Sequence, residues 1–111
     1  DQPASRAVEY KLDPVGMLVE QSWESTGFRG YSPFMGDANE LQNGNILIAF
    51  GGLTDPPTND LYSPRVKKWA RVLEMDRTGK VAFEFTVRDQ LSTDFHGYHV
   101  SRVERVQGFP R

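Results

Sequence analysis

Hydrophobic and polar residues alternate along most of this chain, and few stretches repeat at helical spacing, which predicts β-strands. The first two strands are expected over residues 7–12 and 17–23, on either side of a turn over 13–16. Pro14 fixes the φ of an early turn position, and Gly16 is expected to take the positive φ that closes the turn. The chain is therefore predicted to open with a β-hairpin.

A second hairpin is expected over 37–50, where strands 37–41 and 45–50 flank the turn 42–44, Gln-Asn-Gly. Asn-Gly is the strongest short hairpin signal, because both residues tolerate the positive φ of a type I′ turn. Both faces of strand 45–50 are apolar, so this strand is expected to be buried on both sides. A polar loop rich in proline and glycine follows over 51–68, and loops of this length are usually functional or disordered.

A third hairpin is expected from strands over 69–75 and 80–87, and a last strand over 98–106. The turn 76–79, Asp-Arg-Thr-Gly, echoes the Asp-Pro-Val-Gly of 13–16, and each is followed by alternating apolar residues. A strand–turn–strand unit that recurs, with another hairpin between, is typical of an array of propeller blades. A small antiparallel sandwich or meander is the other architecture that the pattern allows.

The predicted fold class is therefore all-β, built from antiparallel blades of a β-propeller. Residues 7–24 are expected to form a half-blade hairpin, residues 37–87 a full blade with the long loop 51–68, and residues 98–106 a closing strand. Because a propeller has about four to eight blades, we interpret the chain as a fragment or small subunit that is incomplete alone. The remainder of the propeller is expected to come from the same gene product or from a second chain.

Composition narrows the classes of function. The 111 residues contain no cysteine, which removes a disulfide framework, a thiolate zinc site and a cysteine nucleophile. The formal net charge is −2 and no basic stripe is visible, so no nucleic acid partner is expected. No apolar run approaches the roughly 20 residues that span a bilayer, so no membrane partner is expected. The chain begins at Asp1, not methionine, and we expect that an N-terminal segment has been removed.

Three stretches then suggest a family. They are 8–13 with 19–24, Tyr-Ser-Pro at 31–33 with the strand leading to Phe-Gly-Gly at 50–52, and Tyr-His-Val at 98–100 with the residues after it. In order and approximate spacing they resemble the C-terminal end of the bacterial arylsulfate sulfotransferases (arylsulfotransferases), which are six-bladed propeller enzymes. The resemblance covers nearly the whole chain from Val8 on.

The resemblance implies that a sulfuryl group moves from an aryl sulfate to a phenol, by way of a covalent sulfohistidine and without a cofactor. A neutral imidazole nitrogen is a nucleophile near pH 7, and fixed cations and donors stabilise charge on the sulfuryl oxygens. In the family the nucleophilic histidine, its companion histidines and an arginine belong to earlier blades, which would place them before Asp1. No catalytic residue is therefore assigned within this chain, and the isolated chain is expected to be inactive.

The resemblance also assigns four residues to the substrate pocket: Tyr98, His99, Tyr31 and Met35. Tyr98 stands where the family has an active-site tyrosine, and is expected to hydrogen-bond the phenolic oxygen or the sulfuryl group. His99 replaces an arginine and keeps a hydrogen-bond donor without a permanent charge. Met35 replaces a threonine, so a hydroxyl is absent. Tyr31, close to Pro33, is interpreted first as a packing residue at a corner of the chain and second as a site residue.

Other interpretations remain open. His96 and His99 are the only histidines, and without carboxylate or thiolate ligands at a recognisable spacing they predict no metal site. The alternative function is a non-catalytic propeller or β-sheet module that binds a protein or ligand, with the loop 51–68 as its contact surface. A third is a small stand-alone β domain that binds a ligand. The family resemblance implies a periplasmic or exported protein and allows a homo-oligomer.

Overall fold

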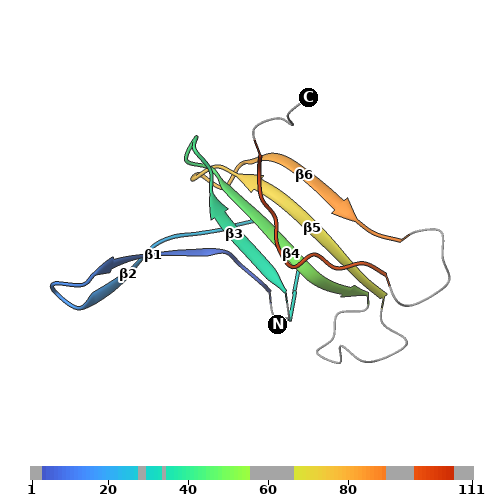
Figure 1. Cartoon of the computed structure of the whole chain (residues 1–111), viewed down its shortest axis with the longest axis horizontal. Coiled ribbons are helices and arrows are strands. Elements are labelled where there is room, and N and C mark those ends of the chain that lie inside the picture. Colours follow the sequence, from blue (N-terminus) through green and yellow to red (C-terminus); the bar gives the residue numbers. More distant parts are fainter. Residues whose placement is uncertain (1–3, 28–29, 34, 56–66, 90–96, 107–111) are drawn as a thin grey trace.

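The computed structural model describes residues 4–27, 30–33, 35–55, 67–89 and 97–106. Within these ranges the chain forms six strands in two antiparallel sheets (Figure 1). The predicted all-β antiparallel class is confirmed. No helix long and apolar enough to cross a membrane occurs in the described part of the chain.

The first sheet is a two-stranded hairpin of β1 (Val8–Asp13) and β2 (Leu18–Glu24). In its turn, the Asp13 carboxylate accepts the backbone N–H of Val15 at 3.1 Å and that of Gly16 at 2.9 Å. The positive φ, 55°, falls on Met17 rather than on Gly16, so the predicted closing residue is wrong. The Asp13 side chain binds the N–H groups of the two residues before Met17. The left-handed conformation therefore falls on Met17, one residue later in the chain than expected.

The second sheet is a four-stranded meander. It contains β3 (Gly36–Glu40), β4 (Ile46–Asp55), β5 (Lys67–Met75) and β6 (Val81–Val87), in the order β3-β4-β5-β6. The hairpins lie where the sequence predicts them, but β4 runs five residues past its predicted end. The expected loop 51–68 is therefore shorter at both ends, and its central part, 56–66, lies outside the described residues.

The turn between β3 and β4 and the turn between β5 and β6 share one geometry. In the turn after β3, the Gly44 N–H donates to the Leu41 carbonyl and the Leu41 N–H donates to the Asn45 carbonyl. The turn between β5 and β6 has the two equivalent hydrogen bonds. The glycines of the two turns, Gly44 and Gly79, have φ of 86° and 94°. Only these glycines have positive φ there, so the predicted type I′ turn at 42–44 is wrong. The pattern is that of a type I turn closed by a glycine bulge.

One face of the large sheet packs against the base of the hairpin, and we call it the hairpin face. Its buried side chains come from alternate positions of the two central strands. They are Ile46, Ile48, Phe50 and Leu53 of β4 with Leu73 and Met75 of β5. Ala7 is buried among them, and Trp23 of β2 packs against them with part of its surface exposed. Trp23 therefore lies between the two sheets.

The opposite face is covered by residues 97–106, which we call the strap, and we call this the strap face. Leu47, Ala49 and Val72 form its buried apolar bed, and Val100 and Val103 of the strap pack on that bed. With both sets of side chains covered, β4 is buried on both sides, as predicted. Figure 1 shows the strap (red) running obliquely across the strands rather than beside one of them.

The predicted closing strand over 98–106 is wrong. Gly97 makes an isolated bridge to Lys68, and the residues after it belong to no strand. The physical reason is visible at Val103, whose N–H donates to the Asp37 carboxylate and whose carbonyl accepts from the Asn39 side chain. Because side chains satisfy these backbone groups, the strap needs no neighbouring strand.

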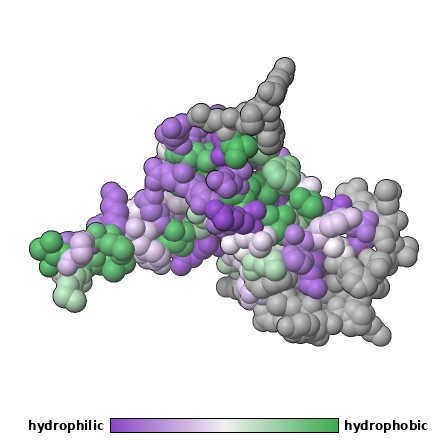
Figure 2. All heavy atoms as spheres, viewed as in Figure 1, coloured by the Kyte–Doolittle hydropathy of each residue, from purple (hydrophilic) through white to green (hydrophobic). Residues whose placement is uncertain are grey.

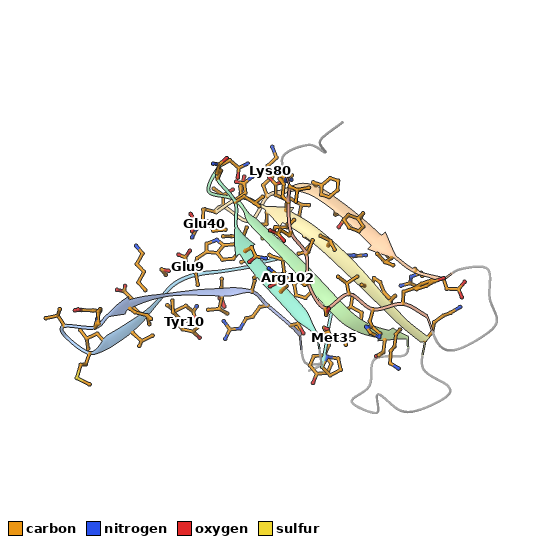
Figure 3. The ribbon with its side chains drawn as sticks, in the orientation of Figure 1. Glu9, Tyr10, Met35, Glu40, Lys80 and Arg102 are labelled. Carbon is orange, nitrogen blue, oxygen red and sulfur yellow. The ribbon has the colours of Figure 1, made fainter. Side chains whose placement is uncertain are left out.

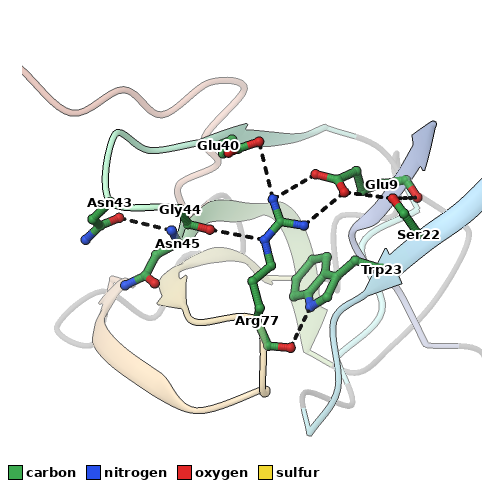
Figure 4. A network of polar contacts seen from close by, with 8 residues as sticks. All are labelled: Glu9, Ser22, Trp23, Glu40, Asn43, Gly44, Asn45 and Arg77. Carbon is green, nitrogen blue, oxygen red and sulfur yellow. Dashed lines mark hydrogen bonds and ion pairs between the residues drawn. The ribbon is translucent and has the colours of Figure 1, made fainter. Parts of the chain in front are cut away.

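The hairpin is fixed to the large sheet by Arg77, which lies in the turn between β5 and β6 (Figure 4). Its guanidinium donates to both carboxylate oxygens of Glu9, at 2.9 and 2.8 Å, and to the Gly44 carbonyl at 3.1 Å. Glu40 lies 3.3 Å from the same guanidinium. Trp23 donates its indole N–H to the Arg77 carbonyl at 3.1 Å and lies under the guanidinium, 5.8 Å from ring centre to Cζ.

This contact changes the acidity of Glu9. The Arg77 guanidinium, with a smaller contribution from the Ser22 hydroxyl, lowers the pKa of Glu9 to about 2. Glu9 in turn raises the pKa of Arg77 above its ordinary value. The pair therefore stays charged across the neutral and mildly acidic range, and joins the two sheets throughout it.

The far end of the hairpin and the outer strand β6 carry large apolar side chains that the described part of the chain leaves exposed or only partly covers. Figure 2 shows a hydrophobic surface over the hairpin tip, where Val15 is 94 % and Met17 87 % exposed. On β6, Phe83 and Phe85 are 48 % and 42 % exposed and meet edge to face, 5.7 Å between ring centres. Contiguous exposed apolar surface of this kind marks a contact site for another protein surface.

Candidate functional site

Two of the sequence stretches that suggest a family meet at one point of the fold, the bulge of β4. The pairing of β4 with β5 shifts between Phe50 and Leu53, where Gly51 and Gly52 stand. The Gly51 N–H donates to the Met35 carbonyl at 3.1 Å, and the Gly51 carbonyl accepts the Val100 N–H at 2.9 Å. Bulges are common beside active sites because they redirect the chain and its side chains.

Ser32 of the Tyr-Ser-Pro segment is bound to the same bulge. Its hydroxyl accepts the Gly52 N–H at 2.8 Å and donates to the Met35 carbonyl at 2.9 Å. Its backbone N–H donates to the Ser5 hydroxyl at 2.7 Å, which attaches the segment before β1. Through its hydroxyl and its backbone, Ser32 therefore links the start of β3, the middle of β4 and the N-terminal segment.

Glycine at position 51 is required by close approach. A Cβ built there would lie 1.6 Å from the Val100 carbonyl oxygen and 3.3 Å from the Met35 Cβ. Gly97 is constrained similarly: it has φ of 68°, and its Cβ would lie 2.0 Å from the Lys68 carbonyl oxygen. The two glycines allow the strap backbone to lie directly on the sheet.

We call the bulge of β4, with the Met35 and Val100 segments bound to it, the junction. The structure places the four predicted pocket residues around this junction, and they differ in how exposed they are. Met35 is 37 % exposed at the start of β3 and has φ of 58°, a conformation uncommon outside glycine (Figure 3). Tyr31 is half-buried in the segment before it. Tyr98 is 55 % exposed, with its N–H bound to the Lys68 carbonyl at 3.0 Å, and His99 is exposed between Tyr98 and the junction.

A cleft near the junction has a volume of about 420 Å³. It lies on the hairpin side of β3, between the segment before β1 and strand β4, and Ser5, Arg6, Ser32, Met35 and Phe50 are among its walls. Of the four predicted residues, Met35 is the one that lines it. Asp37 also lines the cleft, and the Arg6 guanidinium pairs with Glu24, so the cleft combines an apolar wall with two hydroxyls, a paired guanidinium and a carboxylate.

Two carboxylates hold the strap on its face of the sheet. Asp37 accepts the Val103 N–H at 3.1 Å and the Asn39 side-chain N–H at 2.9 Å. The Val103 N–H is the main cause that lowers the pKa of Asp37, with smaller contributions from Asn39 and the charge of Arg102. Val103 and Arg102 both belong to the strap, so the strap helps to keep the Asp37 carboxylate charged.

The second carboxylate that holds the strap is that of Glu74 in β5, and only 7 % of its side chain is exposed. The Asn45 side chain donates to it at 2.7 Å, and Arg105 of the strap forms an ion pair with its other oxygen. The Asn45 hydrogen bond is the largest cause that lowers the pKa of Glu74, followed by Arg105 and by Asn43 at 3.4 Å. A carboxylate buried to this degree needs such partners to stay charged.

Acid is therefore expected to release the strap. A carboxylate whose pKa is lowered by folding stabilises the fold fully above its ordinary pKa, about 4, and this contribution disappears as pH falls through the lowered value. In an NMR titration from pH 7 to pH 2, the Val103 amide proton should keep its shift down to about pH 4 and move upfield below it. The chain with Asp37→Asn should show no such titration. A Val103 amide that is insensitive to acid in the unaltered chain would contradict the contact.

The residues that build the junction include several that the sequence interpretation missed. Ser32, Asp37 and Asn39 were not assigned to the site, and Gly51 was placed at the start of a loop. The paired glycines after an apolar strand were a usable signal, because glycine inside a strand pattern often marks a bulge or a close backbone approach. In the described ranges, no three His, Asp or Glu side chains gather closely enough to hold a metal ion; His96 lies outside these ranges.

Comparison with models of protein families gives a match. The family model described as Arylsulfotransferase (ASST) matches residues 1–99, which include the Tyr-Ser-Pro stretch and the bulge and end within the strap, one residue before Val100. No curated protein and no solved structure matches the chain. The family match does not favour a non-catalytic binding module. Because the match spans 99 of the 111 residues, the chain belongs to the arylsulfotransferase (ASST) family.

Proposed function

We propose that this chain is a C-terminal part of an arylsulfotransferase propeller and contributes a wall of its substrate pocket. The reaction moves a sulfuryl group from an aryl sulfate to a phenol, through a sulfohistidine that lies outside this chain. The observation that carries the proposal is the junction at Gly51, where the Met35 segment and the Val100 segment bind one bulge. Family membership provides the class of reaction.

The architecture supports a larger assembly. The β3–β6 meander has the four antiparallel strands of one propeller blade, and the β1–β2 hairpin packs on its face as half of a neighbouring blade would. The radius of gyration is 16.0 Å, whereas a compact domain of this length has about 13 Å. The exposed hairpin tip and the Phe83–Phe85 pair on β6 are the surfaces on which the remainder of the propeller would pack.

Within this proposal, Tyr98 and His99 are the polar groups presented to substrate. Both are exposed, so each is accessible to a ligand that approaches the junction. The Tyr98 hydroxyl would donate to the phenolic oxygen or to a sulfuryl oxygen, and the His99 imidazole would donate without a fixed charge. Met35 and Tyr31 would form the apolar wall against the aryl ring.

Replacing Tyr98 by phenylalanine tests this role. In the complete protein, Tyr98→Phe is expected to lower kcat with a chromogenic aryl sulfate by about ten- to a hundredfold, because one donor to the developing charge is lost. Thermal unfolding should be unchanged. Tyr10→Phe, an equally exposed tyrosine on the hairpin, is the matched control and should leave kcat unaltered. Unchanged kinetics in Tyr98→Phe would reduce Tyr98 to a packing residue.

The broader proposal has its own test. The complete protein should lose turnover of the aryl sulfate when residues 1–111 are deleted, and the isolated chain should show none. Turnover that survives the deletion would overturn the proposal. A periplasmic or exported location and a homo-oligomeric state belong to the same proposal, and cell fractionation and light scattering on the complete protein measure them directly.

A further inference from the structure

Met35 has an unusual backbone conformation where the chain enters β3. Its φ is 58° although it is not glycine, and such a conformation persists only where surrounding contacts determine it. Met17 also has a positive φ, but it lies in the tight turn of the hairpin, where such a conformation is ordinary. Met35, by contrast, lines the cleft (Figure 3). Strained residues gather at ligand sites, so the contacts that hold Met35 bear on function.

The Met35 carbonyl is held by two donors. The Ser32 hydroxyl donates to it at 2.9 Å, and the Gly51 N–H donates to it at 3.1 Å. The Ser32 hydroxyl also accepts the Gly52 N–H at 2.8 Å, so one hydroxyl bridges Met35 and the bulge of β4. These bonds fix the direction of the Met35 carbonyl, and therefore the conformation of Met35 itself.

Ser32 is in turn held by Ser5. The Ser5 hydroxyl accepts the Ser32 N–H at 2.7 Å and donates to the Ser32 carbonyl at 3.3 Å. The Ser5 N–H donates to the Gly30 carbonyl at 2.8 Å, which keeps the two segments side by side. Because its own backbone is held on both sides, Ser32 presents its hydroxyl to Met35 in one fixed direction.

The apolar walls of the cleft differ in how firmly they are held. Ile48 and Phe50 are 2 % and 4 % exposed and belong to the core of the hairpin face, so they are fixed by packing. Met35 is 37 % exposed, and its conformation depends on hydrogen bonds. The shape of the cleft therefore depends on Met35, and through it on the Ser32 hydroxyl.

We propose that Ser32 is a positioning residue for the aryl group of the substrate, and that it acts through Met35. This role rests on the proposed function, in which Met35 forms part of the apolar wall against the aryl ring. Ser32 touches no reacting atom, because its hydroxyl is engaged by Met35 and Gly52. Without that hydroxyl, Met35 relaxes toward the negative φ that is ordinary for its residue type, and its side chain is redirected.

Kinetics of the complete protein with a chromogenic aryl sulfate test this role. Ser32→Ala is expected to raise KM about tenfold and to leave kcat within about twofold, because a wall binds the ground state and the transition state alike. This pattern is the reverse of that expected for Tyr98→Phe. Ser32→Thr keeps the hydroxyl and should restore KM to within about twofold of the unaltered protein.

Ser22→Ala is the matched control. The Ser22 hydroxyl makes two hydrogen bonds, both to Glu9 in the hairpin, so its removal costs stability away from the cleft. Its loss should leave KM unaltered. A KM that rises equally in Ser22→Ala and Ser32→Ala would mean that general destabilisation is the cause, and would overturn the proposal.

A double variant shows whether Ser32 acts through Met35. Met35→Gly removes the wall and adopts a positive φ without strain, so it should raise KM about as much as Ser32→Ala does. Because both changes disable one wall, the double variant should have a KM within about twofold of either single variant. Effects that multiply in the double variant would show that Ser32 acts by another route, and would overturn the proposal.

A measurement without turnover separates this proposal from the proposed function. When the methionine methyl groups of the complete protein are isotope-labelled, the NMR signal of Met35 is the one that Met35→Gly removes. Ser32→Ala should shift that signal and Ser22→Ala should not; an unmoved signal in Ser32→Ala would overturn the proposal whatever the kinetics. If the unaltered protein turns over no aryl sulfate, the proposed function fails and the role of Ser32 fails with it. If it does so while Ser32→Ala leaves KM unchanged, the role of Ser32 alone fails.

Discussion

Replacing Gly51 with valine is expected to detach the strap and to lower the free energy of unfolding by about 3 kcal/mol or more, the range for severe overpacking. A side chain at position 51 has no space, because its Cβ alone would lie 1.6 Å from the Val100 carbonyl oxygen. Either the strap moves away, and Val100 and Val103 lose their apolar bed, or β4 shifts and loses its bond to Met35. Urea unfolding of the full chain measures the loss of stability. Limited proteolysis of the strap after Val100 measures its detachment.

The matched control is Gly36→Ala. Gly36 also lies in a strand beside β4, but its Cβ would meet only the Ala49 carbonyl oxygen, at 3.2 Å. Its expected cost is below about 1 kcal/mol, because a shift of a few tenths of an ångström relieves the contact. If Gly51→Val and Gly36→Ala destabilise the chain equally, close approach at the bulge is not what holds the strap.

Removal of the Trp23 side chain is expected to have the second largest effect, about 2–3 kcal/mol for a partly buried tryptophan. The indole covers the hairpin face of the large sheet, donates its N–H to the Arg77 carbonyl and lies beneath the Arg77 guanidinium. With Trp23→Ala, the hairpin should separate from the sheet while β3–β6 stays paired. Hydrogen exchange by NMR should then show faster exchange in β1 and β2 than in β4 and β5.

Tyr10→Ala is the control for this prediction, since Tyr10 lies in the same hairpin and is 55 % exposed. Its loss should change the free energy of unfolding by less than about 0.5 kcal/mol. A cost for Tyr10→Ala as large as that for Trp23→Ala would mean that the hairpin is stabilised by its own pairing and not by docking. Unaltered exchange in β1 and β2 after Trp23→Ala would have the same meaning.

The hairpins were predictable because their signals are local. Alternation of polar and apolar residues located all six strands to within a few residues, apart from the end of β4, and the two-sided apolar pattern of 46–50 correctly predicted a strand buried on both faces. The turn types were less predictable. In the first hairpin, hydrogen bonds to the Asp13 side chain change which residue takes the left-handed conformation. In the turn at 42–44, Gly44 alone has a positive φ, whereas a type I′ turn needs two such residues.

The strap could not be predicted from its own residues. Its apolar residues recur every two or three positions, and its backbone groups at Val103 bind Asp37 and Asn39, 66 and 64 residues away in the sequence. The candidate site had the same difficulty, because Met35 and Val100 become neighbours only when both bind Gly51. Contacts that depend on side chains of distant segments leave no local periodicity to detect.

The meander of β3–β6 has a consequence for the order in which the chain folds. Every pairing in that sheet joins strands adjacent in sequence, whereas the strap closes a loop of more than sixty residues onto β3. Short loops close at lower entropic cost and faster than long ones, so the sheet forms first and the strap docks on a finished surface. Contacts of the strap are then absent from the transition state, and they govern how slowly the chain unfolds rather than how fast it folds.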